Sequence, residues 1–244
     1  MMSGIFMHRF FSPTSLTEML TLQEGALFHQ ILNVFRAKKG DRFIFFEAYG
    51  DDRVYEVIDI SKKHIHLEQK EIIPRSDNQS QRKQIAVFQA FPNKVATMET
   101  IVQKMVEIGV HQLVFFSSDR SQIHEIPAAK IARLTAIAQE ALEQSWGNTP
   151  LIMNFSKENT EHIYLKRGQD IQHIVGYPGH KKTLEIDKKS QKYALWIGPE
   201  GGWSENEVIF FEKQKCHLWT FNNRVLRLET ASIVGAGILA YSLE

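Results

Sequence analysis

The sequence predicts an α/β fold that follows a smaller, strand-rich region. Two observations support this prediction. From residue 84 onward, short apolar runs alternate with longer segments of helical periodicity, which is typical of a mostly parallel sheet covered by helices. Up to residue 72, short segments rich in β-branched and aromatic residues are separated by turn residues, and this spacing suits a small barrel.

In the strand-rich region, strands are expected at residues 41–46, 53–60 and 64–68. The period of residues 27–35 fits a helix as well as an extended segment, so both remain open. Residues 74–83 are polar and lack apolar periodicity, which predicts a connection between domains. We therefore expect a first domain at 1–72, a linker at 73–83 and a second domain at 84–244.

The second domain is expected to contain strands at 85–91, 112–116, 171–177, 192–197 and 217–221. Helices are expected between and after them, at 94–108, 126–145, 204–214 and 230–242. Two helix ends carry clear signals. Gly109 stands where a helix C-terminus favours glycine, and Ser204 with Glu207 forms a capping box ahead of residues 205–214.

Composition restricts the class of protein. The 244 residues carry a net charge of +1, so any binding to nucleic acid would depend on local patches and shape. The single Cys216 excludes an internal disulfide and suits a reducing compartment. The apolar stretch 231–243 is too short to span a bilayer, and residues 1–10 lack the apolar run of a signal peptide. We expect a soluble, cytoplasmic protein without a membrane partner and, because its ten histidines lack the usual ligand spacings, without a metal.

Residues 198–207, Gly-Pro-Glu-Gly-Gly-Trp-Ser-Glu-Asn-Glu, follow a buried strand and precede a capped helix. Glycines let the backbone approach a ligand and offer free N–H groups, and a strand, glycine loop and helix N-terminus together often bind nucleotides. The segment is neither a P-loop nor a dinucleotide fingerprint. A glycine-rich turn with a good helix cap would explain it equally well.

Arg224, Arg227 and Glu229 lie within six residues, directly ahead of a helix rich in Ala, Ser and Gly. They could form a solvated edge, or Arg227 could pair with Glu229. Charged residues directly before a nearly all-apolar helix are more typical of a pocket or an interface, and we favour that interpretation. By contrast, the spacing of Lys104 and Glu107 indicates a solvated helix face.

Taken in order, several segments resemble one family, the uridine-N3 methyltransferases of small-subunit ribosomal RNA (the RsmE family of the SPOUT superfamily). The resemblance covers nearly the whole chain. It is carried by residues 8–11, 29–36, 39–41, Lys94, 103–110, 143–145, 197–202 and 224–231. Three positions depart from the family pattern: Trp146-Gly-Asn stands in place of glycine and arginine, Phe221-Asn in place of leucine and glycine, and Leu228 in place of threonine.

The resemblance implies a PUA-like β-barrel domain for RNA, followed by a SPOUT domain with a C-terminal trefoil knot that binds S-adenosylmethionine. It also implies a homodimer whose active sites lie at the subunit interface, and 16S rRNA or the small ribosomal subunit as partner. The cofactor-binding residues it implies are Gly176, Tyr177, Pro178, Ile197, Gly198, Pro199, Gly201, Gly202, Leu218, Phe221, Asn222, Arg224, Val225, Leu226, Leu228 and Thr230.

For the reaction, we expect Arg227 to stabilise the developing uracil anion, with Glu229 or Glu200 orienting it or accepting its proton. The residues expected to contact RNA are His8, Arg9, Arg36, Lys94, Lys104, Glu143 and Gln144. Residues 1–72 carry nine Lys and Arg against ten Asp and Glu, so this domain would recognise shaped RNA and not act as an electrostatic funnel. Two alternatives stay open: a methyltransferase of the same fold with another nucleotide target, and a module that binds RNA without catalysis.

Overall fold

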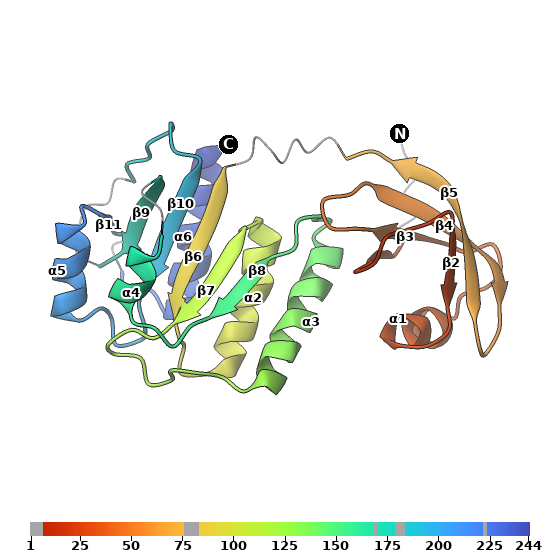
Figure 1. Ribbon diagram of the computed structural model, residues 1–244, viewed down its shortest axis with the longest axis horizontal. Coiled ribbons are helices and arrows are strands. Elements are labelled where there is room, and N and C mark those ends of the chain that lie inside the picture. Colours follow the sequence, from red (N-terminus) through yellow and green to blue (C-terminus); the bar gives the residue numbers. More distant parts are fainter. Residues whose placement is uncertain (1–6, 76–82, 168–169, 179–183, 222–223) are drawn as a thin grey trace. The chain divides into compact units, whose positions relative to one another are not determined.

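The computed structural model describes residues 7–75, 83–167, 170–178, 184–221 and 224–244. The chain forms two compact units (Figure 1). One contains Met1–Gln79 together with Leu142–Thr149, and the other contains Ser80–Ala141 and Pro150–Glu244. Residues 142–149 therefore belong with a unit that is remote from them in sequence. Most of the expected linker, residues 76–82, lies outside the described residues.

The first unit is built on one sheet with strand order β1-β3-β4-β5-β2. Its strands are β1 (Arg9–Phe11), β2 (Met19–Leu22), β3 (Arg42–Phe46), β4 (Asp52–Ile60) and β5 (Ile65–Ile73). β1 pairs with β3 in parallel, and the other pairings are antiparallel. The segment left open at 27–35 is helical: α1 (Ala26–His29) continues into a π-helical turn at Gln30–Val34.

Aromatic side chains form the core of the first unit. Phe10, Phe43, Phe45 and Tyr55 pack in one cluster with Ile31 from the helical segment. β5 runs five residues beyond its expected end at 68, because residues in the segment 69–73 pair with β4. Cross-strand pairing thus determines the length of this strand more than local composition does.

The second unit is an α/β fold with a parallel sheet, as predicted. Its strands are β6 (Gln84–Ala90), β7 (Gln112–Phe116), β8 (Ile152–Phe155), β9 (Ile171–Gly176), β10 (Lys192–Ile197) and β11 (His217–Trp219), in the order β11-β9-β10-β6-β7-β8. Every pairing is parallel. Its helices are α2 (Val95–Ile108), α3 (Ala128–Gln144), α4 (Thr160–Leu165), α5 (Glu205–Lys213) and α6 (Leu228–Leu243).

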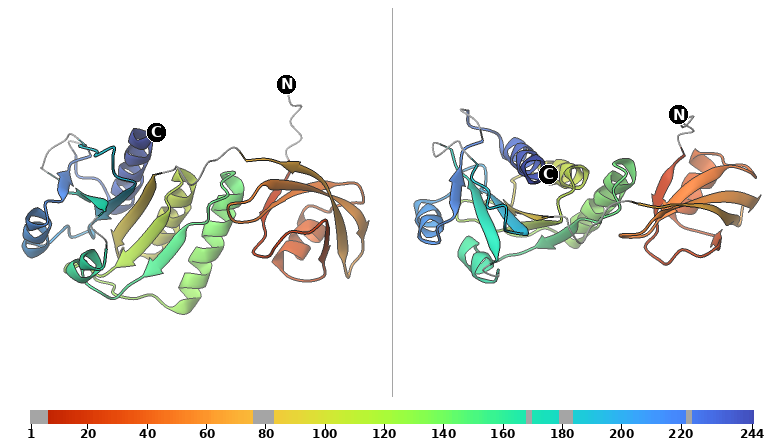
Figure 2. Two further views of the ribbon diagram at one scale, coloured as in Figure 1. Left: turned by 45° about the horizontal axis from the view of Figure 1, so that its top comes forward. Right: turned by 90° about the horizontal axis from the view of Figure 1, so that it is seen from above.

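Helices cover both faces of this sheet. α2 and α6 lie side by side on one face, and α4 and α5 lie together on the other (Figure 2). The two predicted helix signals are confirmed: Gly109 is left-handed, with φ of 83°, at the end of α2, and Ser204 and Glu207 form a reciprocal capping box at the start of α5. Among the described helices, none is long and apolar enough to cross a membrane.

Four elements were not expected from the sequence: β1, β2, β8 and α4. The three strands have only three or four residues each, and β2 and β8 are half exposed. Such short edge segments carry too little periodicity to be recognised locally. α4 has a clear signal, since the Asn159 side chain accepts a hydrogen bond from the backbone N–H of His162, but its six residues cover barely two turns.

Candidate cofactor and substrate site

A cavity of about 760 Å³ opens at the carboxyl ends of β6, β9, β10 and β11. From β6 the chain first builds outward through β7 and β8, and it then returns to build β9, β10 and β11 on the opposite side of β6. Ligands of open parallel sheets bind outside the carboxyl ends of the strands, at such reversals of strand order. The volume is also within the range of small-molecule sites.

The glycine loop after β10 forms one wall of the cavity, with Ile197, Gly198, Pro199, Glu200 and Gly202 among the lining residues. The Gly202 N–H donates to the Pro199 carbonyl over 2.9 Å, and Gly202 has φ of 70°, which favours glycine. A Cβ on Gly198 would lie 3.1 Å from the Trp203 indole. The glycines are therefore required by the turn and by close packing of Trp203.

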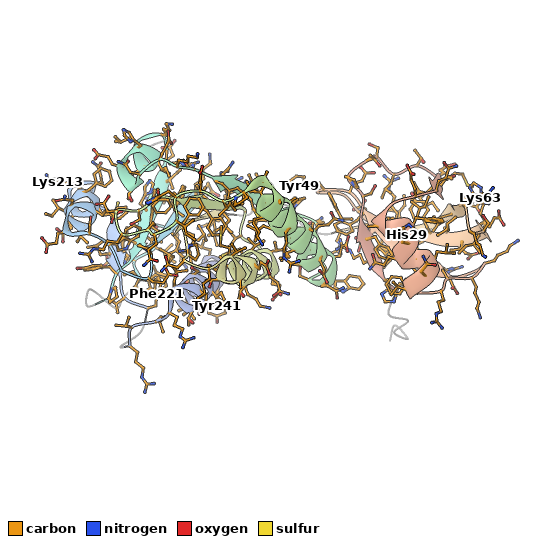
Figure 3. The ribbon with its side chains drawn as sticks, turned by 90° about the horizontal axis from the view of Figure 1, so that it is seen from below. His29, Tyr49, Lys63, Lys213, Phe221 and Tyr241 are labelled. Carbon is orange, nitrogen blue, oxygen red and sulfur yellow. The ribbon has the colours of Figure 1, made fainter. Side chains whose placement is uncertain are left out.

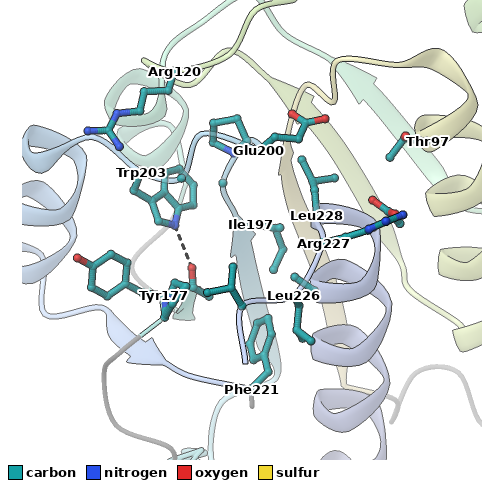
Figure 4. A pocket seen from close by; sticks show the side chains of 18 of the residues that line it. Thr97, Arg120, Tyr177, Ile197, Glu200, Trp203, Phe221, Leu226, Arg227 and Leu228 are labelled. Carbon is teal, nitrogen blue, oxygen red and sulfur yellow. Dashed lines mark hydrogen bonds between the residues drawn. The ribbon is translucent and has the colours of Figure 1, made fainter. Parts of the chain in front are cut away.

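Hydrogen bonds join the loops after β9, β10 and β11. The Trp203 indole N–H donates to the Gly176 carbonyl over 3.0 Å, as drawn in Figure 4. The Tyr177 N–H donates to the Trp219 carbonyl over 3.0 Å, and the Thr220 hydroxyl donates to the Tyr177 carbonyl over 2.8 Å. Three segments that are distant in sequence are thus held as one continuous surface.

Phe221 fills the space between two glycines at the base of this surface. A Cβ added at Gly176 or at Gly235 would approach Cζ of Phe221 to 2.8 Å in either case. The ring also makes an edge contact with Trp219, at 4.4 Å between centroids and 72° between planes. The Phe221 departure is therefore accommodated by glycines on β9 and α6. Asn222, which was also expected at the cofactor, lies outside the described residues.

The segment ahead of α6 forms a further wall. Arg227 is the residue that precedes the first turn of α6, and its carbonyl accepts the Ala231 N–H over 2.8 Å. The Leu228 side chain is buried, whereas Arg224, Val225 and Arg227 are exposed. The free N–H groups and positive dipole end of this 16-residue helix favour negative charge nearby.

Charged side chains of both signs line the cavity. The basic ones are Lys94, Arg120, Arg224 and Arg227, and the acidic ones are Glu200 and Glu229. Arg227 extends toward Thr97 on one side, and Arg120 lies on the opposite side near Trp203 (Figure 4). Glu200 Oε1 accepts the Asn93 N–H over 2.9 Å, and Arg120 donates to the Gly201 carbonyl over 3.1 Å. The excess of positive charge suits an anionic substrate.

The three residues expected to act in catalysis, Arg227, Glu229 and Glu200, line this one cavity. So do twelve residues expected at the cofactor, namely Gly176, Tyr177, Pro178, Ile197, Gly198, Pro199, Gly202, Phe221, Arg224, Val225, Leu226 and Leu228. Among the described residues, Leu218, Gly201 and Thr230 are not part of the cavity wall. Leu218 is instead buried in the apolar core.

Sequence reasoning missed other lining residues: Asn93, Thr97, Arg120, Trp203 and Ala231. Trp219 and Thr220 also line the cavity, between Leu218 and Phe221, which were expected at the cofactor. Lys94, expected to contact RNA, also lies here. Asn93 and Lys94 follow the strand β6, so the rule that parallel sheets bind ligands at carboxyl ends could have found them. Arg120 comes from the loop after β7, and no comparable local signal marks it.

The expectation that Arg9 contacts RNA requires correction, because its side chain is only 2% exposed. Its guanidinium donates two hydrogen bonds to Asp52 Oδ1, at 3.0 and 2.9 Å, and one to the Gly147 carbonyl at 2.7 Å. It also lies 3.4 Å from the centroid of the Phe46 ring. Every face of this cation is used within the first unit, so Arg9 has a structural role.

The other residues expected at RNA occupy varied environments. His8 and Arg36 are exposed, and the His8 ring lies 3.8 Å from Phe35, between centroids. The Glu143 carboxylate accepts the Phe11 N–H over 3.0 Å, and Gln144 is exposed. Lys104 is partly exposed and pairs with the exposed Glu107 along α2, in agreement with a solvated face.

Comparison with known proteins places this geometry in context. A family model described as "RNA methyltransferase domain" matches residues 78–240. The chain is 29% identical over 236 residues to ribosomal RNA small subunit methyltransferase E of Bacillus subtilis, covering 90% of this chain and 89% of the relative. It is 27% identical over 234 residues to ribosomal RNA small subunit methyltransferase E 2 of Borreliella burgdorferi, covering 92% of each.

Among solved structures, the fold is similar to that of ribosomal RNA small subunit methyltransferase E from Neisseria gonorrhoeae bound to S-adenosyl methionine. The TM-score is 0.83, the identity is 23%, and the match covers 97% of this chain and 98% of the other. The similarity therefore extends over both units of the chain.

Proposed function

Because the chain belongs to the RNA methyltransferase domain family and, within it, to the ribosomal RNA small subunit methyltransferases E, we propose that it methylates N3 of a specific uridine in 16S rRNA. Its methyl donor is S-adenosylmethionine, the ligand of the solved Neisseria gonorrhoeae structure with the same fold. The observation that carries the proposal is one cavity in which glycine loops, basic side chains and two carboxylates meet.

The residues of the cavity fit this cofactor. Apolar surfaces from Ile197, Leu226 and Trp219 suit a purine ring, and the backbone of residues 176–178 and 198–202 offers groups for its polar edges. When bound, S-adenosylmethionine supplies an electrophilic methyl group on a sulfonium. We further propose that the second unit contains the C-terminal trefoil knot of the family that the sequence resembles.

The chain itself must prepare the uracil. N3 carries a weakly acidic imide proton, which a carboxylate oxygen of Glu229 or Glu200 accepts. Arg227 stabilises the anion that this leaves on the ring, and the nearby N-terminus of α6 contributes in the same sense. Lys94 and Arg224 hold the flanking phosphates.

The first unit docks on the RNA as a PUA-like barrel, through the exposed His8 and Arg36. We further propose a cytoplasmic homodimer with its active sites at the subunit interface. Apolar side chains exposed on α6, Ile238 at 38% and Tyr241 at 79%, support a partner surface there.

The variant Arg227→Ala tests the catalytic assignment. It should reduce methyl transfer to small-subunit particles by a factor of about 10² to 10⁴, while S-adenosylmethionine affinity measured by calorimetry stays within a few-fold. Arg133→Ala provides a matched control, because Arg133 is exposed on α3 and forms an ion pair with Glu99. Unchanged turnover in Arg227→Ala would contradict the assignment.

The alternatives are separated by two further measurements. If the chain only binds RNA, calorimetry of the unaltered protein will detect no S-adenosylmethionine binding. If it methylates another nucleotide, mass spectrometry of ribosomal RNA from a strain lacking the protein will show N3-methyluridine intact and a different modification lost. Loss of N3-methyluridine near the 3′ end of the small-subunit RNA is the result that the proposal requires.

A further inference from the structure

A second cluster of polar side chains lies in the first unit, far from the cavity in sequence. Strand registers place Thr21 of β2 opposite His66 of β5, and His66 opposite Asp59 of β4. His64 lies in the turn that joins β4 to β5, directly before β5, and its ring lies 4.4 Å from that of His66, between centroids. Three adjacent strands and this turn thus bring one hydroxyl, two imidazoles and one carboxylate to a single patch.

The potential ligand atoms of Asp59, His64 and His66 all lie within 4.8 Å of one another. Nε2 of His64 is 2.8 Å from Asp59 Oδ2, and the two imidazole rings are 4.4 Å apart between centroids. The sequence spacing gave no sign of this cluster, because pairing between β4 and β5 assembles it.

Hydroxyl groups hold the other nitrogen of each ring. Ser61 Oγ lies 3.1 Å from Nδ1 of His64, and Thr21 Oγ1 lies 2.9 Å from Nδ1 of His66. Histidine ligands of metals usually have the second ring nitrogen hydrogen-bonded, which fixes the tautomer and the ring orientation. A hydroxyl therefore holds Nδ1 of each imidazole. Nε2 of His66, and Nε2 of His64 in place of its present hydrogen bond to Asp59, are the nitrogens that would bind an ion.

We propose that Asp59, His64 and His66 form a binding site for a divalent transition-metal ion, with Zn²⁺ as the best match. Two imidazole nitrogens and one carboxylate oxygen supply three ligands, and water completes a tetrahedral set. This role lies apart from the methyltransferase reaction and does not depend on it.

The charged residues in and beside the cluster indicate which class of metal ion it would bind. Only Asp59 contributes a negative charge, and Lys62 and Lys63 occupy the turn beside it (Figure 3 labels Lys63). Mg²⁺ and Ca²⁺ favour oxygen ligands and several carboxylates, which this patch lacks, whereas imidazole suits Zn²⁺, Ni²⁺ and Cu²⁺. An ion bound here would connect the turn at 61–64 to the adjacent strands β2, β5 and β4. We therefore expect it to raise the stability of the first unit.

Calorimetry of the full chain with ZnCl₂, after treatment with a chelator, tests the proposal. One ion should bind per chain, with MgCl₂ giving no heat of binding. His64→Gln and His66→Gln should each weaken the affinity at least tenfold, and Thr21→Val, which leaves all three ligands, should weaken it about 10- to 100-fold. His162→Gln is the matched control, because this histidine is exposed on α4 in the other unit.

A second measurement uses the unaltered protein and so does not depend on how the variants fold. Zn²⁺ should protect His64 and His66 from diethyl pyrocarbonate, detected by peptide mass spectrometry, while His162 stays reactive. No saturable Zn²⁺ binding, equal affinity in His64→Gln and His162→Gln, or uniform modification of all three histidines would each overturn the proposal.

Discussion

The contact between Phe221 and α6 leads to a quantitative prediction about Gly235→Ala. The new Cβ would lie 2.8 Å from Cζ of Phe221, where ordinary contact begins at 3.4 Å, so the ring must move by about 0.6 Å. The ring has little room to move, because the same edge also lies close to Gly176. A Cβ built on Gly176 would likewise be 2.8 Å from Cζ of Phe221. Overpacking of this kind costs about 1–3 kcal/mol, against a gain of about 1 kcal/mol from alanine in a helix.

We therefore expect Gly235→Ala to destabilise the second unit by up to about 2 kcal/mol. In a Phe221→Leu background the smaller side chain leaves room, and the same change should stabilise by up to about 1 kcal/mol. Gly237→Ala is the matched control on the same helix, because its Cβ would meet nothing within 4 Å. It should stabilise in both backgrounds.

The double-mutant cycle consists of the unaltered protein, Gly235→Ala, Phe221→Leu and the variant with both changes. Unfolding these four proteins in guanidinium, followed by tryptophan fluorescence, gives the coupling free energy between the two positions. Trp196, Trp203 and Trp219 all lie in the second unit and report on it. A coupling below about 0.5 kcal/mol, or a Gly235→Ala result equal to that of Gly237→Ala, would refute the packing argument.

Three further outcomes are expected. Asp52→Asn should cost about 3–5 kcal/mol in chemical denaturation of the first unit, because it leaves the buried Arg9 cation without its counter-charge. Ser204→Ala should cost about 1 kcal/mol by the loss of its hydrogen bond to the Glu207 N–H, whereas Ser15→Ala, at an exposed serine, is the control that should leave stability unchanged. His173 should destabilise the fold as the pH falls from 6.5 to about 4, since burial lowers its pKa to about 4 and the unfolded chain binds the proton more readily. His173→Asn should flatten that pH dependence, and an unchanged slope would contradict it.

The sign of the His173 effect follows from its hydrogen bond as well as from burial. The Trp196 indole N–H can only donate, and it lies 3.0 Å from Nδ1 of His173, so this nitrogen must carry a lone pair. Protonation of Nδ1 would break the bond. The stabilising contribution is therefore present above pH 6.5, declines between 6.5 and about 4, and is lost below that.

The sequence predicted correctly those features of the fold that depend on residues close to one another in the chain. The helix with Met98, Ile101, Val102 and Met105 on one face, the left-handed Gly109 and the capping box at Ser204 each depend on residues no more than seven positions apart. The same holds for the glycine loop at 198–202, where the need for φ of 70° at Gly202 is set by one turn. The parallel sheet followed from the alternation of these segments.

What the sequence could not predict depends on contacts between distant segments. Arg9 was expected to contact RNA together with His8 and Arg36, yet Asp52 and the Gly147 carbonyl, 43 and 138 positions away, enclose it. Arg75 donates a third hydrogen bond to the same carboxylate, at 2.7 Å. Asp52 is thus shared by two arginines, and neither partner is marked by spacing or composition.

The same reasoning explains where the departures from the family pattern are tolerated. Trp146 has φ of 59°, and its carbonyl accepts a hydrogen bond from Arg75 over 2.8 Å. Arg9, Asp52 and Arg75 therefore form a connected network with the segment 142–149, which explains why this segment belongs with the first unit. At the cavity, Phe221 is compatible with the fold only because both Gly176 and Gly235 lack a side chain. Each departure is matched by residues remote in sequence, so its effect on activity has to be judged from packing and not from the motif alone.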